Sequence, residues 1–274
     1  MLKLYHWLLS ISVLNSEAKK FITKAVSLMF VYVFIIMLTN TFLILFALDF
    51  LTITQLGVIL ACQFAVQAIT DYPTAAIGDW IGQRWLLCIA ALTYAVGFFF
   101  LSQASSFTFI LIAFILIGFA QGQESGAFVS WFDNNYKLYA TEDEDRRVYS
   151  QFFGKFRMIY EIITASSFIL GGILVIFISR QSMFLIQGIL LGLFSLIFLF
   201  MIRDHKAIKR DKPNFRSYFR FLEDGMRTVA RNKTLRLLVL GLVISGTGFV
   251  IWANLILFPE NGCAPFATLH AGMV

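Results

Sequence analysis

Several ionisable and amide side chains lie inside long apolar stretches of this sequence. Glu124 follows "GFAQGQ" in one stretch, and Arg157 and Glu161 are one helical turn apart in the next. Because an ionisable group in contact with lipid is costly, such a residue is expected to pair with a partner or to face a water-filled cavity. These residues therefore suggest binding or proton transfer within a membrane rather than covalent catalysis.

The glycines around Glu124 predict the direction in which it points. Gly118, Gly122 and Gly126 recur at every fourth residue, and such a small-residue stripe lets a neighbouring helix pack closely. At about 100° per residue, Glu124 lies roughly opposite this stripe. We therefore expect Glu124 to face an inner cavity, and it is the preferred proton carrier if the protein moves protons.

Further polar side chains extend this candidate cavity. Arg157 and Glu161 form either an internal ion pair or part of the cavity site. The second apolar stretch carries a polar stripe at four-residue steps, which either lines the cavity or makes interhelical hydrogen bonds. The first stretch places an amide and a phenol on one helix face. The additional candidates are Gln63, Gln67 and Asp71 in the second stretch, Asn40 and Tyr32 in the first stretch, and Gln121, which lies three residues before Glu124.

The composition is that of an all-α integral membrane protein. Of the 274 residues, 59% are hydrophobic and 14% are charged, whereas an ordinary soluble domain has about 25% charged residues. The mean hydropathy is +0.78. The net charge of +6 comes from basic residues between apolar stretches rather than on one soluble face. This distribution argues against a nucleic-acid partner.

Seven stretches have the roughly 20 apolar residues that a membrane-spanning helix needs. They cover residues 26–48, 54–77, 85–104, 107–132, 156–178, 182–202 and 236–258. The chain is therefore expected to consist of a cytoplasmic N-terminal segment over 1–25, a six-helix bundle over 26–202, a basic cytoplasmic linker over 203–235, a seventh helix over 236–258 and an irregular tail over 259–274.

The distribution of Lys and Arg predicts the orientation in the cell membrane. Basic residues occur before the first span and after the second, fourth and sixth spans, whereas the opposite side carries only Arg180. Because basic residues near span ends stay cytoplasmic, the N terminus is expected to be cytoplasmic. The linker is either a solvated connector or an amphipathic helix on membrane lipid. The apolar positions of that helix are Phe219, Leu222, Met226 and Val229.

The connection after the second span carries a recognisable pattern. It reads "DYPTAAIGDWIGQRWLL" and resembles the loop signature of the major facilitator superfamily. Asp79, Gly82 and Arg84 match the acid, the glycine and the final basic residue of that signature, while three other positions differ. The lead-in "DYPT" and the later "GQESGAFVSWFDN" are similar to the prokaryotic drug-transporter-like group. The resemblance covers about residues 26–258.

This resemblance implies a secondary transporter that moves a small molecule by alternating access. It implies a six-helix N-terminal half plus one helix, with Asp79, Gly82 and Arg84 as a gating loop. The alternative is that Asp79 and Arg84 only anchor two helix ends among the lipid headgroups. Proton coupling is not supported by the antiporter motifs, because Gly118 replaces an arginine and "ASSFILGGIL" lacks the proline.

Superfamily members normally contain two six-helix halves, and this chain contains one. It is therefore expected to be either a truncated product or a functional half that assembles with a second half or a second copy. A non-transporting membrane remnant or interaction subunit is the alternative. We predict no enzyme activity, cofactor or metal, because no phosphate-binding loop, G-x-S-x-G motif or metal-ligand spacing occurs. The acids of "TEDEDRR" are expected to form a solvated loop.

Overall fold

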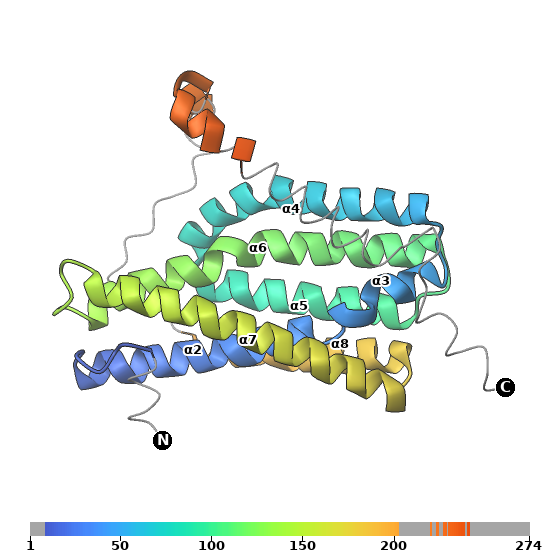
Figure 1. The fold of residues 1–274 in the computed structure, drawn as a ribbon, viewed down its shortest axis with the longest axis horizontal. Coiled ribbons are helices and arrows are strands. Elements are labelled where there is room, and N and C mark those ends of the chain that lie inside the picture. Colours follow the sequence, from blue (N-terminus) through green and yellow to red (C-terminus); the bar gives the residue numbers. More distant parts are fainter. Residues whose placement is uncertain are drawn as a thin grey trace, which may run out of the picture. The chain divides into compact units, whose positions relative to one another are not determined.

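A computed structural model of the chain describes residues 9–202 and a subset of residues between 220 and 241. Within the first range, the side chains of residues 72, 73, 75–77, 79, 80 and 125 are not described. The chain divides into two units, Met1–Pro213 and Asn214–Val274. The described part of the first unit is a bundle of helices (Figure 1), which confirms the predicted all-α class.

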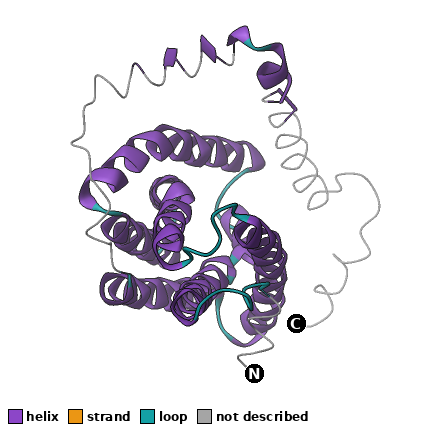
Figure 2. Cartoon of the chain, turned by 90° about the vertical axis from the view of Figure 1, so that its left-hand side faces the viewer, coloured by secondary structure: helices purple, strands orange, loops and turns teal. Residues whose placement is uncertain are grey.

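The helices of the first unit run side by side, as Figure 2 shows nearly end-on. Six of the described helical stretches are long and apolar enough to cross a membrane, and α2 and α3 together form the first of them. The helices are α2 (Ser16–Met37), α3 (Asn40–Leu48), α4 (Ile53–Ile81), α5 (Gln83–Ser102), α6 (Phe107–Tyr139), α7 (Arg147–Phe177) and α8 (Arg180–Met201).

Several helices extend beyond their predicted apolar spans. The helix predicted to begin at residue 26 begins at Ser16, where the Asn15 side chain accepts a hydrogen bond from the Ala18 N–H. Similarly, α6 continues to Tyr139 and α7 begins at Arg147. The apolar pattern marks only the part of a helix that lies in hydrocarbon. Helical hydrogen bonding continues into the polar turns on either side.

The connection between α4 and α5 is much shorter than the sequence suggested. Residues 76–81, which were expected in a loop, are helical, so Asp79 lies in the last turn of α4. Only Gly82 separates the two helices, with φ 103°. A residue with a Cβ rarely adopts this conformation. The prediction that a tight turn depends on Gly82 is therefore confirmed.

The first span is broken near its middle, between α2 and α3. The sequence "LTNT" at the break contains polar side chains that compete for backbone hydrogen bonds. Gln187 of α8 is fully buried against the break, where its amide nitrogen donates to the carbonyls of Ile35 (2.8 Å) and Ile36 (2.7 Å). The Thr39 hydroxyl donates to the Gln187 amide oxygen at 2.5 Å. Gln187 therefore satisfies backbone groups that the break exposes.

Close packing in the bundle depends on the predicted glycine stripe. α5 packs along α6 and α8, and α4 packs along α6. A Cβ on Gly118 would collide with the Gln63 carbonyl of α4, and one on Gly122 would lie 2.8 Å from the Gln67 carbonyl oxygen. A Cβ on Gly126 would meet nothing within 4 Å. Two of the three glycines thus form the contact with α4.

The remaining predictions on domain organisation lie outside the described residues. They concern the apolar positions of the linker, most of the seventh span and the C-terminal tail. In the second unit, the described residues include the exposed basic side chains Arg220, Arg227 and Arg231.

Candidate functional site: a cavity among five helices

A cavity of about 490 Å³ lies among α2, α4, α5, α6 and α7. Its polar wall contains two amides, an acid, an arginine and two phenols. Most of the remaining lining is aliphatic or aromatic. The polar lining residues are Gln67, Gln121, Glu124, Arg157, Tyr94 and Tyr160, and the aromatic ones are Phe64, Phe128, Phe153 and Phe156.

The prediction for Glu124 agrees with this geometry, because the residue lines the cavity rather than the α4 contact. Tyr94 of α5 lines the cavity beside Glu124, close enough to interact with its carboxylate. Tyr32 of α2 and Tyr160 of α7 also lie close enough to interact electrostatically with this carboxylate. Phenols from three helices therefore surround one acid.

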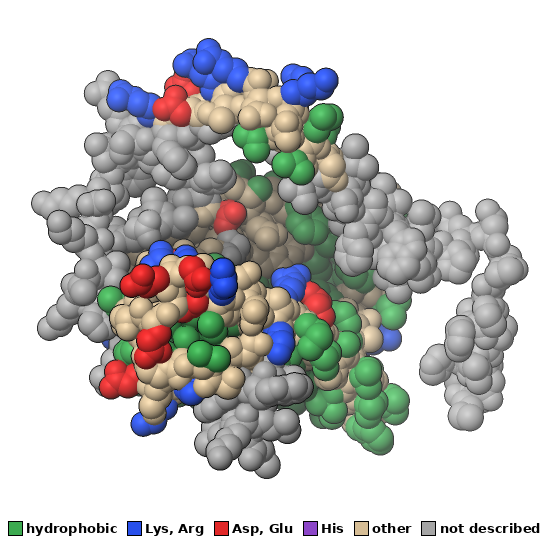
Figure 3. Space-filling model, turned by 60° about the vertical axis from the view of Figure 1, so that its left-hand side comes forward, with side chains coloured by type: hydrophobic (Ala, Val, Ile, Leu, Met, Phe, Trp, Pro, Cys, Tyr) green, Lys and Arg blue, Asp and Glu red, His purple; other side chains and the backbone are tan. Residues whose placement is uncertain are grey.

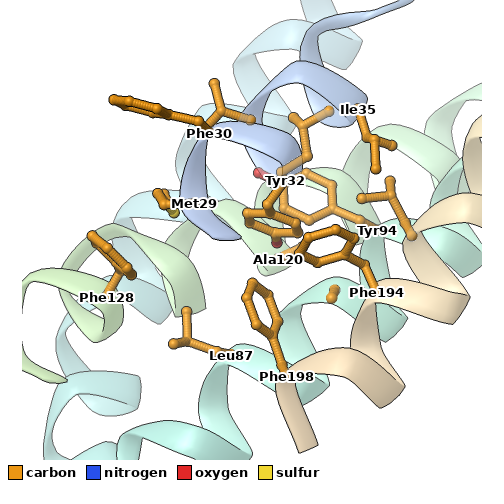
Figure 4. Packing of buried hydrophobic residues seen from close by; sticks show 14 of the residues in the cluster. Met29, Phe30, Tyr32, Ile35, Leu87, Tyr94, Ala120, Phe128, Phe194 and Phe198 are labelled. Carbon is orange, nitrogen blue, oxygen red and sulfur yellow. The ribbon is translucent and has the colours of Figure 1, made fainter. Parts of the chain in front are cut away.

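Tyr32 and Tyr94 enter this region from opposite helices (Figure 4). Tyr32 is fully buried, and its ring packs against Phe194 at 5.5 Å and Phe198 at 4.8 Å between ring centroids. No hydrogen-bond partner for the Tyr32 hydroxyl exists among the described residues. Tyr32, which was a predicted cavity residue, does not contribute to the lining, although it lies close enough to Glu124 to interact with it.

The two tyrosines Tyr94 and Tyr160 were not predicted as site residues. Aromatic residues make up 16% of the sequence, so two more tyrosines in apolar spans carry no distinctive signal. Their significance comes from tertiary structure, because α5 and α7 bring their hydroxyls toward an acid on α6.

The polar stripe of α4 serves two purposes. The Gln63 amide nitrogen donates to the Gln121 amide oxygen at 3.0 Å, which joins α4 to α6 beside the cavity. Gln67 lines the cavity itself. Asp71 is partly buried and does not contribute to the lining. Both readings of the stripe thus apply, each to a different residue.

Arg157 and Glu161 form the expected ion pair, with 2.9 Å between the guanidinium and the carboxylate. Arg157 lines the cavity and lies over the Tyr160 ring at 5.1 Å, whereas Glu161 is outside the lining. Their side chains are 71% and 56% exposed in the protein alone. The pair therefore lies at the rim of the cavity.

The expectation that Asn40 and Tyr32 share a helix face is wrong. The break between α2 and α3 changes the helical register, so Asn40 is exposed while Tyr32 is buried. The Asn40 amide contacts the Met37 sulfur at 3.2 Å. Asn40 does not line the cavity.

A comparison with protein-family models matches the Major Facilitator Superfamily over residues 25–262. The chain belongs to this superfamily. It is a multi-pass membrane protein of a transporter family, as the loop signature indicated. Comparisons with curated proteins and with solved structures gave no match.

The superfamily signature lies at the end of the bundle where α4 meets α5. Gly82 forms the turn, and Arg84 lies in the first turn of α5, partly buried, with its guanidinium 5.5 Å from the centroid of the Trp85 ring. The Asp79 side chain is outside the described part of the chain. The sequence thus places all three signature residues within a few positions of one sharp turn.

The same end of this superfamily bundle carries acidic and basic side chains, which gather in the view of Figure 3. Asp133 of α6 pairs with Lys137 at 2.7 Å and with Arg146. The Arg146 guanidinium also lies over the Tyr149 ring at 3.9 Å. These contacts link the end of α6 to the start of α7.

The prediction that the acids of "TEDEDRR" form a solvated loop is wrong for Asp143, which is 7% exposed. Its carboxylate accepts hydrogen bonds from the Tyr136 hydroxyl (2.7 Å) and from the N–H groups of Val148 (3.0 Å) and Tyr149 (2.9 Å). Burial alone would raise the pKa of Asp143, but these hydrogen bonds outweigh it and hold the pKa below its ordinary value. Asp143 therefore stabilises the first turn of α7.

No group of three or more His, Cys, Asp or Glu side chains that could hold a metal ion occurs among the residues with described positions. Cys62 and Cys88 are both free and partly buried. Among the described residues that line the cavity of this superfamily member, Glu124 is the acid.

Proposed function

We propose that this chain forms the N-terminal half of a secondary transporter that moves a small molecule across the cell membrane by alternating access. The observation that carries the proposal is the carboxylate of Glu124 in a cavity of about 490 Å³ among spanning helices. An ionisable side chain inside a membrane-spanning bundle is energetically costly, and such residues commonly mark a site of binding or proton transfer. Tyr94 lines the same cavity and offers a hydroxyl group near this carboxylate.

In this proposal Glu124 alternates between a protonated form and an ionised form. The ionised carboxylate binds a proton or a substrate from water. Arg157 at the cavity rim and the Gln63–Gln121 amide pair beside the cavity supply further polar groups near Glu124. The N terminus is cytoplasmic, so the α4–α5 turn faces the cytoplasm. Asp79, Gly82 and Arg84 then act as a gate that a second half or a second copy completes.

Membrane vesicles that contain the full chain test the proposal. A proton gradient is imposed, and its collapse on addition of each member of a panel of small molecules is followed with a pH-sensitive dye. Wild-type vesicles are expected to respond to at least one compound, and Glu124→Gln is expected to abolish that response because it cannot release a proton. The control Glu144→Gln removes the same charge from an exposed loop position and should respond like wild type.

Two results would contradict the assignment. Wild-type response in the Glu124→Gln protein would show that this carboxylate does not couple transport. Loss of folded Glu124→Gln protein, measured by its elution as a monodisperse species in detergent, would show that Glu124 has a structural role instead.

A further inference from the structure

A second cavity, of about 410 Å³, lies between α2 and α6 and reaches the last residue of α8. We call it the α2–α6 groove. α2 contributes residues from its first turns, α6 contributes residues from its last turns, and α8 contributes Met201. All of them therefore lie at one end of the bundle, where helices leave the membrane.

The polarity of the α2–α6 groove changes along its length. On α2, Glu17 and Lys20 lie near the helix start, Lys24 follows one turn later, and Leu28 lies about 16 Å deeper than Glu17. On the α6 wall, Trp131 lies about 12 Å deeper than the terminal Tyr139, with the buried Asn135 between them. The α2 wall is thus charged at its outer end and apolar at its inner end.

The charged outer end of the groove is available for a ligand. Lys20 and Lys24 are exposed and are one turn apart on the same face of α2. Neither lysine makes an ion pair with another described residue. With Glu17, the groove has two positive charges and one negative charge, which favours an anion.

The two lysine ammonium groups lie next to apolar residues, at the level where the helices leave the membrane. This arrangement matches a molecule with an anionic headgroup and an apolar chain. We propose that the α2–α6 groove binds an anionic phospholipid, with its phosphodiester between Lys20 and Lys24 and an acyl chain along Leu28 and Met201. The Trp131 ring, only 6% exposed, forms part of the apolar wall. Glu17 accepts a hydrogen bond from a hydroxylated headgroup such as glycerol. This site is separate from the Glu124 cavity and does not depend on the proposed transport.

The test measures lipid binding to the purified full chain in detergent. Dioleoyl phosphatidylglycerol and dioleoyl phosphatidylcholine are titrated separately, and bound lipid is counted by native mass spectrometry. We expect tighter binding of phosphatidylglycerol. Each basic residue beside an anionic headgroup strengthens binding by roughly fivefold. The double variant Lys20→Gln/Lys24→Gln should therefore weaken phosphatidylglycerol binding by about 25-fold and leave phosphatidylcholine binding unchanged.

A matched control separates the groove from total charge. Lys19→Gln/Lys233→Gln removes the same two charges from positions outside the groove, and it should bind phosphatidylglycerol like wild type. Lys20→Arg/Lys24→Arg keeps the charges and should also retain binding. Equal weakening in the control and the groove variant would overturn the proposal, as would equal wild-type affinity for the two lipids.

A soluble headgroup distinguishes a lipid from a free phosphate ester. Glycerophosphoglycerol, the deacylated form of phosphatidylglycerol, keeps the single negative charge of the phosphodiester and has no acyl chain, so it should fail to compete with phosphatidylglycerol at equal concentration. Competition at equal concentration would mean that the groove recognises a free anion, and the lipid assignment would be wrong.

Discussion

Gln187 offers a quantitative test of how the broken first span is stabilised. Replacement by leucine keeps a side chain of similar size, so the packing change is small. It removes both hydrogen bonds to the carbonyls of Ile35 and Ile36 and the one from the Thr39 hydroxyl. The Ile35 carbonyl keeps a bond from the Leu38 N–H at 3.3 Å, whereas the other groups lose a buried partner.

The expected cost follows from these three bonds. A hydrogen bond between membrane helices contributes about 0.6 kcal/mol on average, so loss of the three lowers the free energy of unfolding by about 2 kcal/mol. Thr39→Val removes only one of the bonds and is expected to cost about 0.6 kcal/mol. In the double variant the two costs should not add, because Thr39 and Gln187 share a bond.

The measurement is equilibrium unfolding of the purified protein in mixed micelles, with helical circular dichroism as the signal. Gln103→Leu is the control, since Gln103 is exposed at the end of α5. It should unfold like wild type. A Gln187→Leu protein within about 0.5 kcal/mol of wild type, below the membrane average for even one lost bond, would refute the reasoning. Fully additive costs in the double variant would do the same.

Two further substitutions test particular contacts. Asp143→Asn should lower the free energy of unfolding by about 1 kcal/mol at pH 7, while the control Glu144→Gln, at an exposed position of the same loop, should not. Because the folded pKa of Asp143 lies below its unfolded value of about 3.9, its stabilisation is present above that pH and disappears as the pH falls through the folded pKa; a difference that persists at lower pH would contradict this origin. Gly118→Ala should cost about 1–3 kcal/mol, since its Cβ meets the Gln63 carbonyl, whereas Gly126→Ala meets open space and should be neutral. Equal thermal stability of the two glycine variants would show that the stripe does not set the α4–α6 contact.

The local sequence predicted part of the candidate site, but it did not predict all of the residues that form it. The four-residue glycine spacing was sufficient to place Glu124 away from α4, because a helix fixes the angle between nearby residues. The same rule failed for Asn40 and Tyr32, since the chain is not one continuous helix between them. Tyr94 and Tyr160 join the site from other helices. Such contacts between distant residues have no periodic pattern in the sequence.

The sequence by itself determined the membrane class, the helical composition, the tight turn at Gly82 and the family signature. These properties depend on hydropathy and on backbone preferences, which act over a few residues at a time. The local polar residues of "LTNT" favour the break in the first span, but only tertiary structure brings Gln187, which lies 148 positions after Thr39, to stabilise it. Tertiary structure likewise decided that Asp143 is buried, although its neighbours in the same acidic run are exposed. Burial and hydrogen bonding depend on which helices pack together, and this is a property of the whole bundle.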